Sequence, residues 1–379
     1  MAARVRHVAL DALWLDPGRS GGPETYLRQL APALAAAFPQ TRFTVMTTRR
    51  GAEALRGDGW EDFASVTALP ADEGQRVRRT LAEQALVPAL AAVRRVDVVH
   101  GLASTAPMVL PGLASVVTLH DTTFFRMATF NRVTTWGMKA IVARAARRAD
   151  ALIADSGAAR DDTCATLGLD PARFTVVPLG PGRPPDVEPT GEAELRERYR
   201  LDGRRLVLCV AAKRPHKNQE LLVRAAGALP GDVAIVLVGH PEPYEERLRA
   251  LIGELGVGDR VRLEGYVPDA DLEGLWRLAR CAAFPTLAEG FGLPVLEAML
   301  RGRAVACSDI PVLREVGGDV PFYFDPRDPG AAAQAITAAT GDGGERTEAA
   351  RRRAATFSWQ RAAEGTFAAY ERALAARRG

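Results

Sequence analysis

Short apolar runs alternate with longer stretches of helical periodicity along the first half of the chain. The apolar runs have the length and composition of buried β-strands and fall at 5–13, 43–47, 96–100, 115–120, 151–155 and 174–178. Between them, apolar residues recur at helical spacing over 23–38, 76–93, 132–148 and 157–167. This alternation predicts a parallel sheet with helices on both faces.

The alternation restarts after a segment rich in proline and glycine, 178–189, whose composition is typical of a linker. Further strands are predicted at 206–211, 233–238, 261–265, 281–285, 304–308 and 321–324, with helices between them. From Pro329 the pattern is helical, with breaks around 341–344 and near Ser358. We therefore predict two α/β domains, 1–180 and 181–357, followed by a C-terminal helix in 358–379.

The composition is that of an ordinary globular protein and excludes several classes. The 379 residues carry a formal net charge of +3, which gives no general case for nucleic-acid binding. No apolar run approaches the roughly 20 residues of a membrane span, and the N-terminus enters a strand pattern without a signal peptide. The cysteines lie far apart without metal-ligand spacing, which predicts reduced thiols in a cytoplasmic protein: Cys164, Cys209, Cys281 and Cys307.

The segment 288–297 holds two carboxylates eight positions apart, Glu289 and Glu297. Glu289 follows a predicted strand, at the sheet edge where α/β proteins bind ligands, and Pro294 suits the first turn of a helix. At 1.5 Å per residue, a helical separation of eight residues is roughly 12 Å. One carboxylate would then reach a sugar hydroxyl and the other a ribose. The helix N-terminus would present backbone amides to a diphosphate between them: those of Gly290, Phe291, Gly292 and Leu293. Alternatively, Glu289 caps a turn and Glu297 is a solvated helix residue.

The segment 284–298, followed by 304–316, closely resembles the donor-sugar motif of family 4 glycosyltransferases. The resemblance implies the B-type glycosyltransferase (GT-B) fold, with two facing Rossmann-like domains and an active site in the cleft between them. It also implies an N-terminal acceptor domain, a C-terminal donor domain, and a final helix, 359–377, that crosses back to the first domain. Such enzymes are retaining and metal-independent. In them, the residue matching Glu289 contacts the transferred sugar, and the one matching Glu297 contacts the ribose.

Two further loops bear on the donor. The segment 211–218 follows a buried strand and opens a helix, so Arg214 and Lys217 would stabilise a diphosphate. The family often carries an arginine and a lysine here, but the arginine position varies, and Lys213 is an alternative to Arg214. The simpler alternative is solvated surface charge. A later loop resembles the one that holds the base largely through backbone atoms, and it contains Tyr266 and Val267.

The loop 16–24 joins the first strand to the first helix and contains Gly21 and Gly22. Glycines allow a close backbone approach to phosphate or sugar, although the Gly-x-Gly-x-x-Gly fingerprint is absent. Matched to the glycine-glycine loop of the family, these two become neighbours of a diphosphate or an acceptor. Glu24 is assigned first to favourable charge at the helix N-terminus.

His120 ends a predicted buried strand. A histidine at this place in the family faces the donor sugar, so we assign His120 to the site without making it an essential base. His100 is a weaker candidate at another strand end, and the remaining histidines are assigned to structure: His7, His216 and His240.

The segment 126–148 contains no acidic residue and mixes arginines with Phe130 and Trp136. It predicts peripheral contact with the inner face of a membrane, packing of an apolar stripe on the first sheet, or a groove for a small-molecule acceptor. The pattern does not choose among the three.

Taken together, the resemblance implies transfer of a hexose from a nucleoside-diphosphate sugar to a hydroxyl of a glycan, lipid-linked or small-molecule acceptor. Neither metal nor cofactor is expected. The resemblance of segments 215–218 and 120–121 to the family implies a GDP-mannose-type donor, while UDP and dTDP sugars stay open. Two alternatives are a GT-B phosphorylase or epimerase, and a catalytically silent GT-B protein that binds glycans. The joint presence of Glu289, Glu297, Lys217 and His120 argues against the silent protein.

Overall fold

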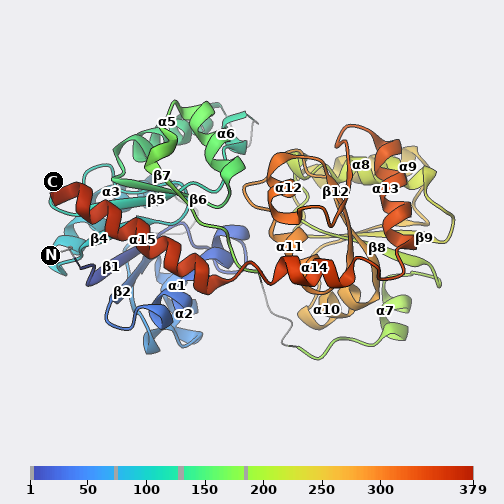
Figure 1. The fold of residues 1–379 in the computed structure, drawn as a ribbon, viewed down its shortest axis with the longest axis horizontal. Helices are drawn as coiled ribbons and strands as arrows, with labels where there is room; N and C mark the ends of the chain where they lie inside the picture. Colours follow the sequence, from blue (N-terminus) through green and yellow to red (C-terminus); the bar gives the residue numbers. More distant parts are fainter. Residues whose placement is uncertain (1–3, 72–75, 127–131, 183–186, 379) are drawn as a thin grey trace. The chain divides into compact units, whose positions relative to one another are not determined.

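The computed structural model describes residues 4–71, 76–126, 132–182 and 187–378. Its chain divides into two compact units. The first contains Met1–Gly180 together with Ser358–Gly379, and the second contains Pro181–Phe357. Each unit carries its own parallel sheet with helices around it (Figure 1).

The described part of the first unit contains a seven-stranded parallel sheet in the order β3-β2-β1-β4-β5-β6-β7. The strand order reverses between β1 and β4, which is the place where open α/β sheets bind ligands, outside the carboxyl ends of the strands. The strands are β1 His7–Ala12, β2 Arg42–Thr47, β3 Ser65–Ala68, β4 Val98–Gly101, β5 Ala114–Thr118, β6 Ala151–Ala154 and β7 Phe174–Val176.

Helices of the first unit form where apolar positions meet capping residues. In α6, the Ser156 hydroxyl accepts a hydrogen bond from the Ala159 amide, and Gly168 ends the helix in the left-handed conformation. The helices are α1 Gly22–Ala37, α2 Arg49–Gly57, α3 Arg76–Val93, α4 Thr123–Arg126, α5 Arg132–Arg148 and α6 Gly157–Leu167, with short 3₁₀ turns at Trp60–Asp62 and Pro171–Arg173.

The second unit repeats this plan. Among its described residues, six parallel strands take the order β10-β9-β8-β11-β12-β13, so the order reverses between β8 and β11. The strands are β8 Arg205–Val210, β9 Val233–Val238, β10 Val261–Glu264, β11 Ala279–Phe284, β12 Ala304–Ser308 and β13 Phe322–Phe324. The helices are α7 Glu192–Arg198, α8 Gln219–Ala225, α9 Tyr244–Glu254, α10 Asp269–Leu278, α11 Leu293–Leu300, α12 Pro311–Gly317, α13 Pro329–Gly341 and α14 Thr347–Ala354, with 3₁₀ turns at Pro215–Lys217 and Ala226–Ala228.

The C-terminal helix α15, Trp359–Arg378, packs within the first unit, where it contacts α1 and the strands β4 to β7 (Figure 1). Phe367 stacks on Phe38 with ring centroids 3.7 Å apart. At the start of the helix, Trp359 lies so close to Gly180 that a Cβ there would sit 2.5 Å from the indole ring. Gly180 therefore allows the chain to pass against Trp359.

The predicted elements agree with the structure, but four further elements were not predicted: α2, β3, α4 and α7. The helix α2 is amphipathic, with Ala52 and Leu55 buried, whereas β3 buries just one fully apolar side chain, Val66. The strand β3 forms because it pairs with β2. This pairing joins residues that are distant in the sequence, so the local pattern of apolar residues does not predict it.

The basic segment 126–148 forms α5 over its described part, while Phe130 lies outside the described residues. Val142 and Ala146 are buried in a core cluster with Val117 and Leu152. Trp136 is 75% exposed. The C-terminal half of α5 thus packs on the sheet. None of the helices in the described ranges combines the length and apolar character that spanning a membrane requires.

Candidate active site

Two loops meet at the switch point of the second sheet. The loop 211–218 leaves the carboxyl end of β8, and the loop 285–292 leaves the carboxyl end of the neighbouring strand β11. In an open α/β sheet, this position outside the strand ends is the expected ligand site.

Lys217 and Glu289 form an ion pair across these loops. Lys217 Nζ lies 2.5 Å from Glu289 Oε1, and the two side chains are 20% and 16% exposed. Both groups were predicted from sequence as site residues, and the structure brings them together although 72 positions separate them. A cation and a carboxylate in contact and partly open to solvent can exchange their mutual contact for a ligand that carries both phosphate and hydroxyl groups.

Backbone and side-chain hydrogen bonds hold the two loops against each other. The Leu287 amide donates to the His216 carbonyl at 2.8 Å, and the Thr286 hydroxyl donates to the same carbonyl at 3.0 Å. The Asn218 side chain donates to the carbonyls of Pro285 and Pro326, both at 2.9 Å. Asn218 itself adopts a left-handed conformation with φ 56°, which turns the chain into α8. The Lys217–Glu289 pair therefore sits on a fixed frame.

The helix α11 begins at Leu293, four residues after Glu289. Gly292 is its N-cap with φ 99°, and a Cβ there would lie 2.6 Å from Leu313. The backbone at Gly292 and Leu293 is positioned at the helix N-terminus, where unpaired amides favour an anion. The Phe291 side chain is buried and packs edge-on against Phe357. Phe291 accordingly offers its backbone and not its ring to a ligand.

Glu297 lies in the second turn of α11, partly buried. The expected separation of roughly 12 Å from Glu289 assumes a continuous helix, whereas the helix starts at Leu293 and the first half of the interval is loop. Burial raises the pKa of Glu297 to about 7, with Arg301 opposing the effect and the Glu273 carboxylate adding to it. Arg301 is held by Glu273 through two hydrogen bonds, one of 3.0 Å.

Of the other basic residues in the loop after β8, Arg214 is 53% exposed and paired with Glu242 at 2.8 Å. Lys213 is fully buried, and its ammonium donates to the carbonyls of Gly239 and Glu264 at 2.8 and 2.6 Å. The alternative that Lys213 binds a diphosphate is therefore wrong, because its ammonium group already donates hydrogen bonds that hold neighbouring loops. Arg214 remains the exposed cation of this loop beside Lys217.

The loop after β10 presents one exposed and one buried side chain. Tyr266 is 84% exposed and Val267 is 6% exposed. Val267 anchors the loop before α10, and its neighbours Tyr266 and Pro268 are exposed.

On the first unit, His120 follows β5 and is held from both ring nitrogens. Nδ1 lies 2.7 Å from Asp155 Oδ2, and Nε2 lies 2.8 Å from the Leu102 carbonyl oxygen. Burial lowers the pKa of His120, but the Asp155 carboxylate and the Leu102 carbonyl outweigh it and raise the pKa above its usual value. Both neighbours accept hydrogen bonds, so the ring is held as a cation. Contact with a sugar hydroxyl requires exchange of the Leu102 bond.

A buried polar chain lies behind His120. The Tyr26 ring packs edge-on against His120 at 4.9 Å, and its hydroxyl lies 3.1 Å from the Thr118 hydroxyl. His100 contacts Thr118 and Tyr370, both at 2.8 Å. Burial and the nearby His120 lower the pKa of His100 to about 3. His100 is thus a neutral residue that joins the sheet to α15, which places it outside the site as a structural residue.

Near the amino end of α1, Gly21 has φ 61°, and no atom lies within 4 Å of a Cβ built on Gly21 or Gly22. This open space permits a ligand to approach the backbone. Glu24 accepts a hydrogen bond from the Gly18 amide at 2.9 Å and pairs with Arg28 at 2.9 Å. Glu24 lies in the first turn of α1, as predicted, and its hydrogen bond with Gly18 also stabilises the preceding loop.

Sequence reasoning missed Asp155, which orients His120. The signal was present: Asp155 follows β6 as His120 follows β5, and these strands pair in parallel. Residues at the carboxyl ends of adjacent parallel strands lie at one edge of the sheet.

Comparison with known protein families decides the affiliation of the chain. Residues 20–180 match the family described as Glycosyltransferase Family 4, and residues 192–356 match Glycosyl transferases group 1. The chain belongs to the family 4 glycosyltransferases. Each match falls in one of the two units.

Curated relatives of this family 4 member include two mannosyltransferases. The chain is 34% identical over 183 residues to O-antigen chain mannosyltransferase B of Escherichia coli, a match that covers 46% of this chain and 48% of the relative. It is 31% identical over 258 residues to MMP alpha-(1->4)-mannosyltransferase of Mycolicibacterium hassiacum, covering 63% and 58%. The chain thus spans about half the length of the curated relatives that it matches.

Solved structures show the GT-B fold for this family 4 member. The Anabaena protein Alr3699/HepE in complex with UDP has a TM-score of 0.71 at 20% identity, covering 96% of this chain and 98% of that one. Sucrose-phosphate synthase from Thermosynechococcus elongatus has a TM-score of 0.74 at 20% identity, with the same coverage. The predicted fold, two Rossmann-like α/β domains, is confirmed.

Proposed function

We propose that this protein is a retaining glycosyltransferase that moves a hexose from a nucleoside-diphosphate sugar to a hydroxyl of a glycan or lipid-linked acceptor. The Lys217–Glu289 pair at the switch point of the second sheet carries the proposal. It places a cation and a carboxylate beside a helix N-terminus, which is the set of groups that a sugar attached to a diphosphate needs.

Each group has a role in the proposed reaction. Lys217, with the exposed Arg214, stabilises the negative charge that develops on the departing diphosphate, and the amides at Gly292 and Leu293 add to it. Glu289 accepts hydrogen bonds from hydroxyls of the transferred sugar. Glu297 accepts from the ribose, and the backbone around Tyr266 and Val267 meets the base.

The bond changes follow from a retaining transfer. The bond between the anomeric carbon and the diphosphate oxygen breaks, and that oxygen takes the electron pair. The acceptor hydroxyl oxygen bonds the same face of the anomeric carbon and loses its proton to the departing phosphate. We assign the acceptor side to the first unit, which holds the open backbone at Gly21 and Gly22 and the predicted site residue His120.

Mannose is the first sugar to test, because both named relatives above are mannosyltransferases. UDP and dTDP sugars remain open as donors. We further propose a cytoplasmic location, since the four cysteines are unpaired, as expected in a reducing compartment. Peripheral membrane contact through 126–148 would suit a lipid-linked acceptor, and the exposed Trp136 is the residue to probe.

The test is sugar transfer with radiolabelled GDP-mannose, UDP-glucose and dTDP-glucose to lipid-linked and soluble glycan acceptors. The proposal predicts label transfer from one donor, and its loss in Glu289→Ala. A wild-type protein that binds acceptor glycans but transfers from none of these donors would instead support a silent glycan-binding protein. Product stereochemistry, read by NMR as retention at the anomeric carbon, tests the retaining step.

A further inference from the structure

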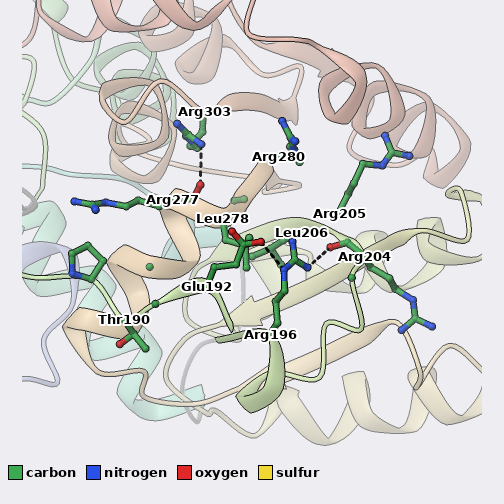
Figure 2. A pocket seen from close by; sticks show the side chains of 15 residues that line it. Thr190, Glu192, Arg196, Arg204, Arg205, Leu206, Arg277, Leu278, Arg280 and Arg303 are labelled. Atoms are coloured by element: carbon green, nitrogen blue, oxygen red, sulfur yellow. Dashed lines mark hydrogen bonds and ion pairs between the residues drawn. The ribbon is translucent and has the colours of Figure 1, made fainter. Parts of the chain in front are cut away.

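A cavity of about 630 Å³ lies at the amino ends of the strands of the second sheet, whereas the Lys217–Glu289 pair lies at their carboxyl ends. It opens at the amino ends of three neighbouring strands, at Arg205 of β8, at Ala279 of β11 and at Arg303 just before β12 (Figure 2). The two ends of the strands are separated by the length of β11, roughly 17 Å for the five steps of 3.3 Å between its six residues. The cavity is therefore distinct from the proposed donor site.

Arginines dominate the lining of this cavity, and Glu192 supplies a carboxylate among them. Figure 2 shows guanidinium groups that come from α7, from the turn before β8, from the end of α10 and from the strand starts. The arginines are Arg196, Arg204, Arg205, Arg277, Arg280 and Arg303.

Half of these arginines are neutralised within the protein. Arg196 pairs with Glu192 at 2.7 Å, and Arg205 pairs with Asp232 at 2.8 Å. Arg204 contacts carboxylates at 3.4 to 3.5 Å. These three side chains are held in place by their partners and form a fixed wall.

The other half have no carboxylate partner among the residues that the structure describes: Arg277, Arg280 and Arg303. The Arg303 side chain donates hydrogen bonds to the backbone. Its Nε donates to the Arg301 carbonyl and a terminal nitrogen donates to the Arg277 carbonyl, both at 3.1 Å. Burial lowers the pKa of Arg303, and the positive charges of Arg351 and Arg280 lower it further. Positive charge without a carboxylate partner is thus concentrated at one side of the cavity. These charges repel one another, and a bound anion would remove the repulsion.

We propose that this cavity binds a small phosphorylated anion, with Arg277 and Arg280 as its principal charged contacts and Arg303 behind them. Guanidinium groups bind phosphate through paired N–H donors, and they keep their charge at any physiological pH. The volume falls within the range of about 300 to 1,000 Å³ typical of small-molecule sites, which favours a soluble metabolite over a membrane headgroup.

Solvation alone is the competing explanation, since arginine is common in this chain and Arg277 and Arg280 are exposed. Isolated solvated arginines would stand apart from one another on a convex surface. Here they line one hollow, and Arg280 lies close enough to Arg303 to depress its pKa. This convergence is what the experiment tests.

Isothermal titration calorimetry with inorganic pyrophosphate tests the site. All proteins carry Lys217→Met, which weakens the proposed donor site, so the pyrophosphate binding that is lost on changing the cavity arginines reports on the arginine cavity. Arg277→Ala/Arg280→Ala should weaken binding by about tenfold or more, because two charge-assisted contacts are lost. Neither side chain has a hydrogen bond or ion pair within the described structure, so the fold should remain.

The matched control is Arg224→Ala/Arg247→Ala, which removes two charges from the same unit, both paired with Glu220. It should leave pyrophosphate binding unchanged. Equal loss in both double variants would show a general charge effect and overturn the proposal, as would unchanged binding in Arg277→Ala/Arg280→Ala. Arg280→Glu provides a second variant that should abolish binding without creating a cavity.

Vesicle sedimentation separates the two sources of phosphate. The proposal predicts that Arg277→Ala/Arg280→Ala does not change binding to vesicles of phosphatidylcholine with phosphatidic acid. Vesicle binding that depends on these two arginines, without pyrophosphate binding, would assign the cavity to a lipid headgroup and contradict the proposal. None of these readouts depends on sugar transfer, so failure here and failure of the proposed function are distinguishable.

Discussion

Replacing Lys217 by Met should suppress catalysis far more than it disturbs the fold. The ammonium lies 2.5 Å from Glu289 on a rigid pair of loops and is 20% exposed. Arg214, the other cation of the loop, is 53% exposed and engaged by Glu242, so it cannot take over the position. Removing one preorganised charge from a site where charge develops costs about 10²- to 10³-fold in kcat, or roughly 3 to 4 kcal/mol.

The same change leaves Glu289 without its partner, and Glu289→Gln in the Lys217→Met background should relieve that effect. The two substitutions should therefore couple in the free energy of unfolding by about 1 to 3 kcal/mol. Transfer should not recover in the double variant, because the charge that stabilises the diphosphate stays absent. Stability and catalysis thus respond differently to the second substitution.

The assay is nucleoside-diphosphate release under saturating donor, with chemical denaturation of each variant in parallel. Arg224→Met is the matched control, since it removes an ion-paired cation from α8, which follows the same loop. Its kcat should stay within about twofold of wild type, as for a surface ion pair. A Lys217→Met variant that keeps more than a tenth of wild-type kcat would refute the role of the ammonium.

Three further outcomes follow from the structure. Since the pKa of Glu297 is raised to about 7, its carboxylate forms as the pH rises through that value, and the KM for the donor should fall from pH 6 to pH 8. Glu273→Gln removes a negative neighbour of Glu297 and should move the midpoint of this fall in KM to lower pH. A KM that does not change with pH would exclude Glu297 from donor binding. Gly180→Ala should lower the unfolding free energy by about 1 to 3 kcal/mol through a clash with Trp359, whereas Gly231→Ala, with no atom within 4 Å of its Cβ, is the control for denaturant titration. Transfer should persist after dialysis against EDTA, because Lys217 and Arg214 supply the positive charge; activity that is lost and then restored by Mg²⁺ or Mn²⁺ would contradict a metal-independent mechanism.

Much of the fold could be predicted from the sequence because its strands are short apolar runs and its helices are long and regular. The helices over 76–93 and 157–167 and the strands over 233–238 and 304–308 have the bounds that the local pattern predicts. The strand β3 could not be predicted, since its pairing with β2 and not its own composition makes it a strand. The local pattern of apolar residues predicts only those elements that are determined by their own residues.

The candidate site likewise has features that the sequence predicts and features that only the folded chain shows. The residue types at strand ends were readable, as for Glu289 and Lys217, but their partners were not. Glu242 binds Arg214 from 28 positions away and Asp155 binds His120 from 35 positions away. The burial of Lys213, which lies beside the exposed Arg214, also depends on loops that meet it only in the folded chain.

The most direct test of a nucleotide-sugar site on the second unit is thermal unfolding of wild type and Lys217→Met with UDP, GDP, dTDP and ADP. A diphosphate at about 100 times its dissociation constant stabilises a protein by roughly 2.7 kcal/mol. One nucleotide should raise the melting temperature of the wild type clearly, with GDP first in expectation, and should raise that of Lys217→Met much less. An unchanged melting temperature with every nucleotide, or an equal shift in both proteins, would contradict a donor site at Lys217 and Glu289.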